Sequence, residues 1–273
     1  MILVNGLYQQ QIDITDRGFQ YGDGLFETIE VLNSTPLFFS QHLARLELGC
    51  HKLGLHFPGV QLLTEEAELL MVNQSHAVLK IIVTRGSGGR GYKLPEQAQP
   101  SRVLSLHPFP VYRENYQNQG IVARFCQIRL GLNPFLAGIK HLNRLEQVMA
   151  RAEWSDPDIQ EGLMLDINDH VIEGTHSNLF YVKNGQFYTA ELIGTGIAGV
   201  VRKIIIQLLA IHHKPVIEHQ FNRAALLAAD ELFVCNSIIG IWPIIVLAEK
   251  KFSVGVFTRQ IQAWYADFKH QEL

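Results

Sequence analysis

Residues 162–189 read GLMLDINDHVIEGTHSNLFYVKNGQFYT and predict a meander of short β-strands. Turn-forming pairs interrupt the apolar runs at residues 168–169, Asn-Asp, and at residues 184–185, Asn-Gly. The carboxyl group of Glu173 falls in the middle of this meander. The stretch therefore predicts neighbouring strands that carry one acidic side chain between two turns.

The chain on either side of the meander predicts further helices and strands in mixed order. A glycine-rich loop at residues 194–199, GTGIAG, leads into an apolar helix, and the C-terminus predicts a final helix. Strands are also expected at residues 120–130 and 231–237, and helices at residues 142–154 and 221–229.

The N-terminal part predicts a smaller unit of strands and helices. Strands are expected at residues 1–6, 26–39 (two strands around a turn), 77–86 and 102–110, and helices at residues 41–53 and 62–73. Ser40 is expected to cap the first of these helices. Residues 111–119 are polar and without periodicity, so we place a linker there, between a domain of residues 1–110 and one of residues 120–273.

Composition and charge exclude several classes of protein. The 273 residues are 47% hydrophobic and 18% charged, with a formal net charge of -3, which is an ordinary globular balance. No block of basic residues stands out, so we expect no nucleic-acid partner. No apolar run reaches the ~18 residues that cross a bilayer, and the N-terminus lacks the pattern of a secretion signal. We therefore expect no membrane segment.

The cysteines and histidines indicate neither a disulfide framework nor a metal centre. Cys50, Cys126 and Cys235 are few, odd in number and far apart, which predicts reduced cysteines in a cytoplasmic protein. The 12 histidines show no metal-ligand spacing, so we expect no metal site.

Lys140 ends the apolar, glycine-containing stretch LNPFLAGIK at residues 132–140. Partial removal from water disfavours the ammonium form of a lysine and keeps its amine nucleophilic. Lys140 is therefore a candidate for a covalent bond to a carbonyl group. A lysine that extends from a strand end to water would have the same local sequence, and this alternative stays open.

Two further features suit an aromatic, phosphorylated cofactor. Glu173 could keep a pyridine nitrogen protonated, which makes the ring an electron sink; an exposed strand glutamate is the alternative. Residues 194–202, GTGIAGVVR, precede a helix, and backbone N–H groups at a helix start favour a phosphate. An ordinary left-handed turn before the helix is the alternative.

Arginines supply candidate anion contacts. Arg45, on the predicted helix 41–53, could bind a phosphate through two hydrogen bonds, or be a solvated helix charge. Residues 85–92, RGSGGRGY, place Arg85 and Arg90 beside Tyr92 on a glycine-rich loop, which suits a substrate with carboxylates; a solvent loop is the alternative. Together, the lysine, the acidic partner and the phosphate-type loop match the demands of pyridoxal 5'-phosphate (PLP).

The order of Arg45, GIKHLNRLEQV, VIEGTHSNLF, GVVR and FVCNS resembles the fold-type IV PLP enzymes, from YGDGLFET to the C-terminal Trp-Pro segment. This family includes branched-chain and D-amino-acid aminotransferases and aminodeoxychorismate lyases. The resemblance implies an α+β fold with a smaller N-terminal α/β domain and a larger C-terminal domain with a barrel-like sheet. It also implies a homodimer that acts on a small-molecule substrate.

The resemblance assigns roles to individual positions. Lys140 would form the Schiff base, Glu173 would pair with the pyridine nitrogen, and Thr28 would face the substrate as a catalytic residue. Arg90 and Tyr92 would bind a substrate carboxylate. The cofactor-binding positions implied are Lys140, Arg45, Glu173, Asn178, the backbone of Val200 and Val201, and the turn at Asn236 and Ser237.

Within the family, the chain looks like the lyase branch. RGSGGRGY and KHLNRLEQV are similar to that branch, and Leu145 stands five residues after the lysine, where transaminases usually have a tyrosine. The resemblance thus implies conversion of 4-amino-4-deoxychorismate to 4-aminobenzoate and pyruvate, for folate synthesis. An aminotransferase on the same fold is the alternative, followed by a non-catalytic PLP-binding protein.

Overall fold

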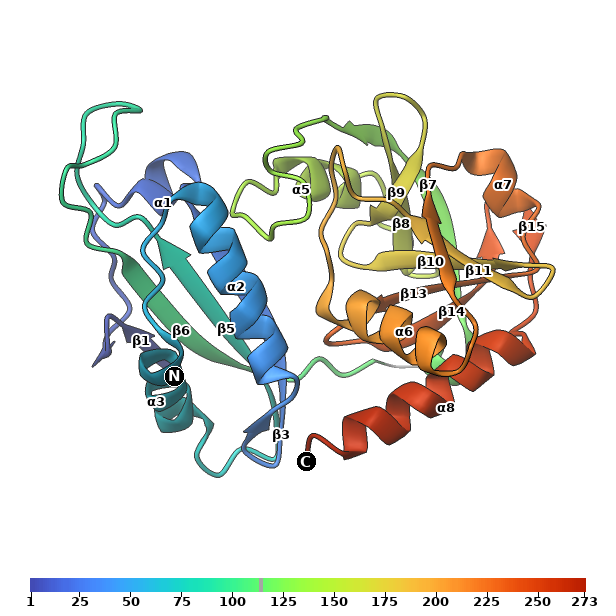
Figure 1. The fold of residues 1–273 in the computed structure, drawn as a ribbon, viewed down its shortest axis with the longest axis horizontal. Helices are drawn as coiled ribbons and strands as arrows, with labels where there is room; N and C mark the ends of the chain where they lie inside the picture. The colour runs from blue at the N-terminus through green and yellow to red at the C-terminus, as the bar shows by residue number, and fades with distance from the viewer. Residues whose placement is uncertain (113–114) are drawn as a thin grey trace. The chain divides into compact units, whose positions relative to one another are not determined.

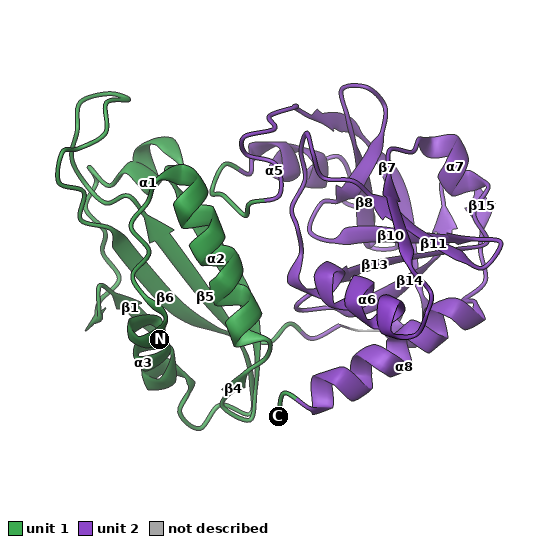
Figure 2. Cartoon of the chain, in the orientation of Figure 1, with its two compact units in different colours: residues 1–110, 139–143, 272–273 green, residues 111–138, 144–271 purple. Residues whose placement is uncertain are grey.

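The computed structural model describes residues 1–112 and 115–273. Their contacts group the chain into two compact units (Figure 2). Unit 1 comprises Met1–Pro110, Ile139–Asn143 and Glu272–Leu273, and unit 2 comprises Val111–Gly138 and Arg144–Gln271. The segment with Lys140 thus groups with unit 1, although its place in the sequence had assigned it to the second domain. Residues 113–114 of the expected linker lie outside the described residues, and Tyr116–Gln119 of that linker form helix α4.

Unit 1 is an antiparallel sheet with helices (Figure 1). The strand order is β2-β1-β6-β5-β3-β4. The strands are β1 (Ile2–Val4), β2 (Leu7–Tyr8), β3 (Gly24–Leu32), β4 (Thr35–Pro36), β5 (His76–Thr84) and β6 (Ser101–Pro108), and the helices are α1 (Arg17–Tyr21), α2 (Phe39–Leu53) and α3 (Val60–Met71).

The two faces of this sheet differ in their side chains. Successive residues of a strand point to opposite faces, so Glu27 lies on one face of β3 and Phe26 and Thr28 lie on the other. Glu27 bonds to side chains of α2, and Glu66 of α3 pairs with Arg102 of β6, which is on the Glu27 face. Helices α2 and α3 therefore cover the Glu27 face, and Phe26 and Thr28 lie on the opposite face.

The N-terminal start of α2 differs from the expectation. The helix begins at Phe39 and its N-cap residue is Phe38, with φ of 54° and no side-chain cap, so the expected Ser40 cap is wrong. The Ser40 hydroxyl instead donates to Gln41 Oε1 at 2.8 Å. The tight hairpin that precedes the helix shifts the helix start, and a serine inside the first turn cannot act as its cap.

Unit 2 is built on a closed barrel. The strands are β7 (Ile121–Leu130), β8 (Glu161–Asp166), β9 (Val171–Gly174), β10 (Asn178–Lys183), β11 (Gln186–Ala190), β12 (Val216–His219), β13 (Glu231–Asn236), β14 (Gly240–Leu247) and β15 (Lys250–Lys251). The sheet follows the order β12-β11-β10-β13-β14-β7-β8-β9, and an additional pairing of β9 with β10 closes the ring. The helices of this unit besides α4 are α5 (Leu145–Arg151), α6 (Val200–Ile211), α7 (Arg223–Leu227) and α8 (Val256–His270).

The predicted meander forms strands β8 to β11, each paired antiparallel with the next. Strands β8, β9, β10 and β11 follow one another, and Asp169, Asn184 and Gly185 have positive φ at the two predicted turns. The barrel interior is filled by buried apolar residues, among them Leu163, Leu165, Val171, Leu179, Val234 and Ile244. The sequence analysis did not predict β14, because a continuous apolar run lacks the alternation that marks a half-exposed strand.

In the described ranges, no helix is long and apolar enough to cross a membrane. All three cysteines are free and buried, and burial raises the pKa of each thiol to about 12.

Candidate active site

Lys140 is fixed in unit 1 by a short backbone pairing with β3. The amide of Phe26 donates to the carbonyl oxygen of Lys140 at 3.0 Å, and the amide of Leu142 donates to that of Gly24 at 3.0 Å. A Cβ at Gly24 would lie 2.5 Å from the carbonyl oxygen of Val83 and 2.8 Å from Leu142 Cδ1, so a larger residue would push this segment away. The Lys140 amine lies 4.2 Å from the centre of the Phe26 ring.

A second amine lies on the same face of the sheet. Lys80 pairs with Thr28 across β5 and β3, and its amine lies 5.5 Å from the Phe26 ring centre. Thr28 and Lys140 are half-buried. This face of unit 1 thus combines a hydroxyl, an aromatic ring and two amines. The sequence analysis did not single out Lys80, although its even spacing along β5 from buried Val78 could have placed it on one face with its neighbours.

Arg45 is held against the sheet by a buried carboxylate. Its Nε and Nη2 donate to Glu27 Oε1 and Oε2 at 2.8 and 2.5 Å, and His42 Nδ1 lies 2.6 Å from Glu27 Oε2. Burial of Glu27 opposes its ionisation, but the charge of Arg45 and the bonds from both partners outweigh it and lower the pKa of Glu27 to about 2. Burial also lowers the pKa of His42, which fits a neutral imidazole that donates to the carboxylate.

Glu173 and Asn178 hold one peptide group in unit 2. Glu173 is 3% exposed, and its Oε2 accepts a hydrogen bond from the amide of Ile197 at 2.8 Å. Asn178 Nδ2 donates to the carbonyl oxygen of Ile197, also at 2.8 Å. Ile197 in turn forms a parallel bridge with Gly138, whose amide donates to Gly196 at 2.9 Å. The glycine-rich loop is therefore fixed to the barrel and to the segment that precedes Lys140.

The start of α6 has the character expected of an anion site. Its N-cap is Gly199, with no side-chain cap, and a Cβ there would lie 2.1 Å from Asn178 Oδ1. The side chains of Val200 and Val201 are buried, so only their backbone amides are suited to meet a ligand. Gly196 has φ of +88°, and a Cβ there would lie 2.7 Å from Leu192. Glycine is required at both positions by close packing.

The other cofactor position expected in unit 2 is a turn between β13 and β14. Asn236 Oδ1 accepts from the amides of Ile238 and Ile239 at 2.8 Å, and its Nδ2 donates to the carbonyl oxygen of His176 at 2.9 Å. The Asn236 side chain therefore shapes the turn, and the role of Asn236 and Ser237 toward a phosphate stays a prediction.

Two side chains near Glu173 were not anticipated, the buried carboxylate of Glu161 and the half-buried guanidinium of Arg144. Glu161 accepts from the hydroxyls of Thr175 and Ser177 at 2.6 Å each, and from the amide of Thr175 at 3.0 Å. Burial opposes ionisation of Glu161, but the charge of His176 and these bonds lower its pKa to about 2. Burial lowers the pKa of Arg144, and the negative charge of Glu173 partly offsets this. The sequence did carry a signal for such an acceptor: Thr175 and Ser177, two hydroxyl residues that follow Glu173 and Gly174, need a hydrogen-bond acceptor when they are buried.

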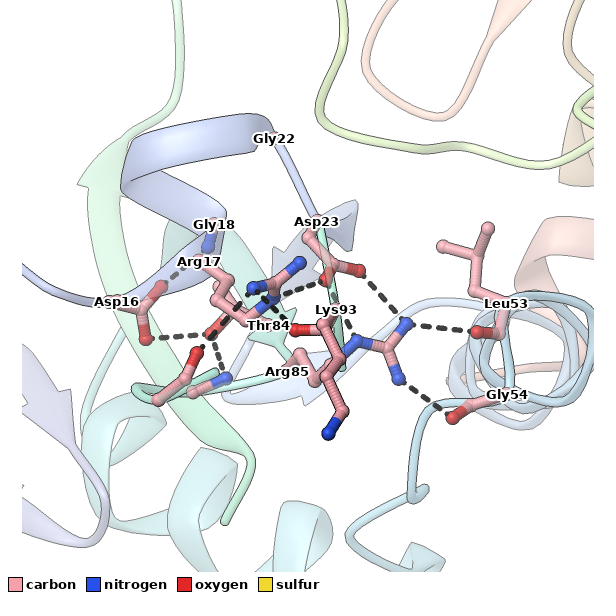
Figure 3. A network of polar contacts seen from close by, with 12 residues as sticks. Asp16, Arg17, Gly18, Gly22, Asp23, Leu53, Gly54, Thr84, Arg85 and Lys93 are labelled. Atoms are coloured by element: carbon pink, nitrogen blue, oxygen red, sulfur yellow. Dashed lines mark hydrogen bonds and ion pairs between the residues drawn. The ribbon is translucent and has the colours of Figure 1, made fainter. Parts of the chain in front are cut away.

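The arginines of the RGSGGRGY loop have different environments. Arg85 is 5% exposed and bonds to both Asp23 oxygens (Figure 3), so the expectation that it meets a substrate is wrong. Arg90 and Tyr92 are exposed, as a ligand contact requires. Leu145, the first residue of α5, is 74% exposed and has no group that could hydrogen-bond a cofactor.

Within the described parts of the chain, no group of three or more histidine, cysteine, aspartate or glutamate side chains could hold a metal ion.

Comparisons with known proteins agree with this picture. The chain is 36% identical to an aminodeoxychorismate lyase of Vibrio harveyi over 96% of this chain and 98% of the relative. It is 43% identical to the solved 4-amino-4-deoxychorismate lyase of Pseudomonas aeruginosa, with a TM-score of 0.93 and 98% of both chains covered. A putative branched-chain-amino-acid aminotransferase of Methanocaldococcus jannaschii is 28% identical over 98% of this chain and 96% of the relative.

These relatives confirm the expected α+β fold of the fold-type IV enzymes. The family model of class IV amino-transferases matches residues 24–246, which include β3, Lys140, the closed barrel and the start of α6. The chain belongs to the class IV aminotransferase family.

Proposed function

We propose that the protein is a PLP-dependent lyase that converts 4-amino-4-deoxychorismate to 4-aminobenzoate and pyruvate. The observation that carries the proposal is the likeness to the P. aeruginosa lyase, at 43% identity over 98% of both chains, against 28% for the M. jannaschii aminotransferase. Leu145 supports it, because a leucine cannot make the hydrogen bond of the tyrosine usual in transaminases.

The residues present fit PLP. The buried carboxyl group of Glu173 suits a protonated ring nitrogen, since a charge partner stabilises an ionised acid in a dry setting. The start of α6, with Gly199 and no side-chain cap, suits a phosphate. Arg45, fixed by Glu27, adds a cation for the phosphate, and Lys140 would hold the aldehyde carbon.

When bound, PLP withdraws electrons from the carbon that bears the substrate's amine. After the substrate's amine has displaced Lys140 from the cofactor, the freed Lys140 amine would remove the proton from that carbon, as a general base. The same amine, now protonated, would return a proton to the departing enolpyruvyl group, which leaves as pyruvate. The remaining ring becomes aromatic, which draws the reaction forward.

Substrate binding would use cations on unit 1. The substrate carries two carboxylates, and Arg90 with Tyr92 would bind one of them. Lys80 lies on the sheet face that carries Phe26 and Thr28, and would offer a second positive charge there. The Thr28 hydroxyl would orient the substrate beside Lys140.

Borohydride reduction of the holoenzyme followed by peptide mapping tests the cofactor assignment. The pyridoxyl label that reduction leaves on the lysine should appear on Lys140. A label on Lys80 or another lysine contradicts the assignment. The Lys140→Ala variant should take up no label and show no turnover. An unlabelled wild-type protein would exclude the PLP proposal altogether.

An aminotransferase is the second candidate function, favoured by the family as a whole and by the M. jannaschii relative. It would use the same lysine to return the proton to the cofactor carbon. Amino transfer from branched-chain amino acids to 2-oxoglutarate measures it. We expect this transfer to be slow or absent beside lyase turnover.

We further propose a cytoplasmic homodimer. The family resemblance supports the dimer, since closed two-fold dimers are the commonest oligomers, and the three buried free cysteines fit a reducing compartment. Sedimentation at micromolar concentration should give the mass of two chains. A fully active monomer contradicts the dimer.

A further inference from the structure

The 86–95 loop, which carries Arg90 and Tyr92, is anchored at its base to Asp23 (Figure 3). Arg85, at the end of β5, donates from Nε and Nη2 to the two Asp23 oxygens at 2.7 and 3.0 Å. It also donates to the carbonyl oxygens of Leu53 and Gly54 at 2.9 and 2.8 Å. The start of the loop is thereby tied to the C-terminal end of α2.

A second arginine lies inside the loop. Arg17, the first residue of α1, donates from Nε to Asp23 Oδ2 at 3.0 Å. Its Nη1 donates to the carbonyl oxygen of Gly91 at 2.9 Å, and to those of Gly88 and Lys93 at 3.5 Å. The side chain is 4% exposed. The loop therefore curls around one guanidinium group that Asp23 fixes from the other side.

The glycines of the loop allow this close approach. A Cβ at Gly89, where φ is +79°, would lie 2.4 Å from the carbonyl oxygen of Lys93 and 3.2 Å from Arg17 Nη1. A Cβ at Gly86, where φ is +81°, would lie 1.8 Å from the carbonyl oxygen of Gln99. The glycine-rich sequence thus gives a folded loop with defined contacts.

An aromatic contact extends the support to Tyr92. The Arg17 guanidinium carbon lies 4.9 Å from the centre of the Tyr21 ring. The Tyr21 and Tyr92 rings meet edge to face, with centres 5.6 Å apart. Tyr92 is 87% exposed, yet its ring is aligned by a residue that rests on Arg17.

Asp23 keeps the negative charge on which both arginines depend. Burial of its carboxyl group opposes ionisation, but the hydrogen bonds and charges of Arg85 and Arg17 outweigh burial and lower the pKa of Asp23. The anchor is therefore ionised at neutral pH.

We propose that Arg17 is a positioning residue for substrate recognition: anchored by Asp23, it holds the 86–95 loop in the conformation that presents Arg90 and Tyr92 to a substrate carboxylate. This inference rests on the substrate-binding role proposed for Arg90 and Tyr92. Because Arg17 acts through the loop, its substitution should raise KM for the substrate more than it lowers kcat, and leave PLP bound.

Limited trypsin digestion of the holoenzyme tests the hold on the loop without reference to substrate. Arg17→Gln should speed cleavage after Arg90 and Lys93 by about tenfold or more, because local opening exposes both bonds. Arg102→Gln is the matched control: it breaks the ion pair of β6 with Glu66 of α3, at 2.7 Å, in the same unit. Its cleavage rate should equal that of the wild type. A cleavage rate of Arg17→Gln that equals the wild-type rate overturns the proposal.

A double-mutant cycle then tests recognition. Arg17→Gln and Arg90→Ala should each raise KM by about tenfold, and the double variant should add little to Arg90→Ala, because both remove one contact. Fully additive effects overturn the proposal. A normal KM in Arg90→Ala alone refutes the proposed role of Arg90, whereas the cleavage rates still report on Arg17. Should Arg17→Gln fail to fold, Arg17→Lys takes its place. Lysine keeps a positive charge for Asp23 but lacks the forked guanidinium that also donates to the loop carbonyls, and the same measurements apply.

Discussion

Glu173 pairs with Asn178 where β9 meets β10, and this pairing closes the barrel of unit 2. The same two side chains hold the peptide of Ile197, one at its N–H and one at its carbonyl oxygen. Barrel closure and the position of the glycine-rich loop before α6 thus depend on one pair of residues.

Asn178→Ala should weaken PLP binding. The variant frees the carbonyl oxygen of Ile197, and the loop before Val200 and Val201 loses its support, so we expect about a tenfold higher Kd, as one lost hydrogen bond of about 1.4 kcal/mol would give. Absorbance titration with PLP measures it. Asn222→Ala, which removes a side-chain cap of α7 in the same unit, is the control and should bind PLP normally. Equal Kd values in both variants would refute the role of Asn178.

Glu173→Gln should retain PLP but lose most turnover. Glutamine still accepts the hydrogen bond from Ile197, so the loop stays in place, but the negative charge is gone. We expect kcat to fall by about 10²-fold or more, as when an electrostatic partner of the reacting group is removed. Steady-state kinetics on PLP-saturated protein measures it, and near-normal kcat would contradict the role of Glu173.

Short-range patterns predicted much of the fold. The Asn-Asp and Asn-Gly turns of the 162–189 meander and the glycine loop before α6 are where the sequence placed them, because turn chemistry is local. The start of α2 and strand β14 were missed. A preceding hairpin decides where α2 begins, and the continuous apolar run of β14 lacks the alternation that marks a half-exposed strand.

The site was predicted less completely, because partners distant in sequence define it. The RGSGGRGY motif predicted that Arg85 would meet a substrate carboxylate. In the structure Arg85 is buried and pairs with Asp23, which lies 62 residues away in the sequence. The sequence analysis did not single out Glu27 or Glu161, because only the fold buries them against Arg45 and Thr175. The periodicity of a sequence predicts the face of a strand or helix on which a residue lies. It does not predict which distant residue that side chain will contact.

Glu27→Gln should weaken PLP binding through Arg45. The change removes the charge that fixes the guanidinium, and charge-assisted hydrogen bonds are worth about 1.5–3 kcal/mol, so we expect Kd for PLP to rise about tenfold or more. Glu66→Gln is the matched control, because it breaks the ion pair of α3 with β6 in the same unit. A Kd that changes equally in both variants would show general loosening of unit 1 and count against a specific role.

Glu161→Gln should destabilise the fold in a pH-dependent way. The pKa of Glu161 is lowered to about 2 in the folded protein, from an ordinary 4.5, so its ionised form stabilises the fold above pH 4.5. This contribution is lost as pH falls from 4.5 toward 2. We expect a loss of about 2 kcal/mol in the free energy of unfolding at pH 7, shrinking below pH 4.5. Urea unfolding at pH 7, 5 and 4 measures it.

The exposed Glu249 offers the control for that measurement, since Glu249→Gln removes the same charge at the surface. It should change the free energy of unfolding little at any of the three pH values. A Glu161→Gln loss that is as small as this, or that grows toward acid pH, would contradict the assignment of Glu161 as a buried ionised support for the loop of Thr175 and Ser177.

The most direct test of the account is the product ratio from 4-amino-4-deoxychorismate. Purified holoenzyme, without any keto acid, should release 4-aminobenzoate and pyruvate in equal amounts, and adding 2-oxoglutarate should change neither rate. Lys140→Ala should release neither product. If no 4-aminobenzoate forms and turnover requires a keto acid, the lyase proposal is contradicted and the aminotransferase takes its place.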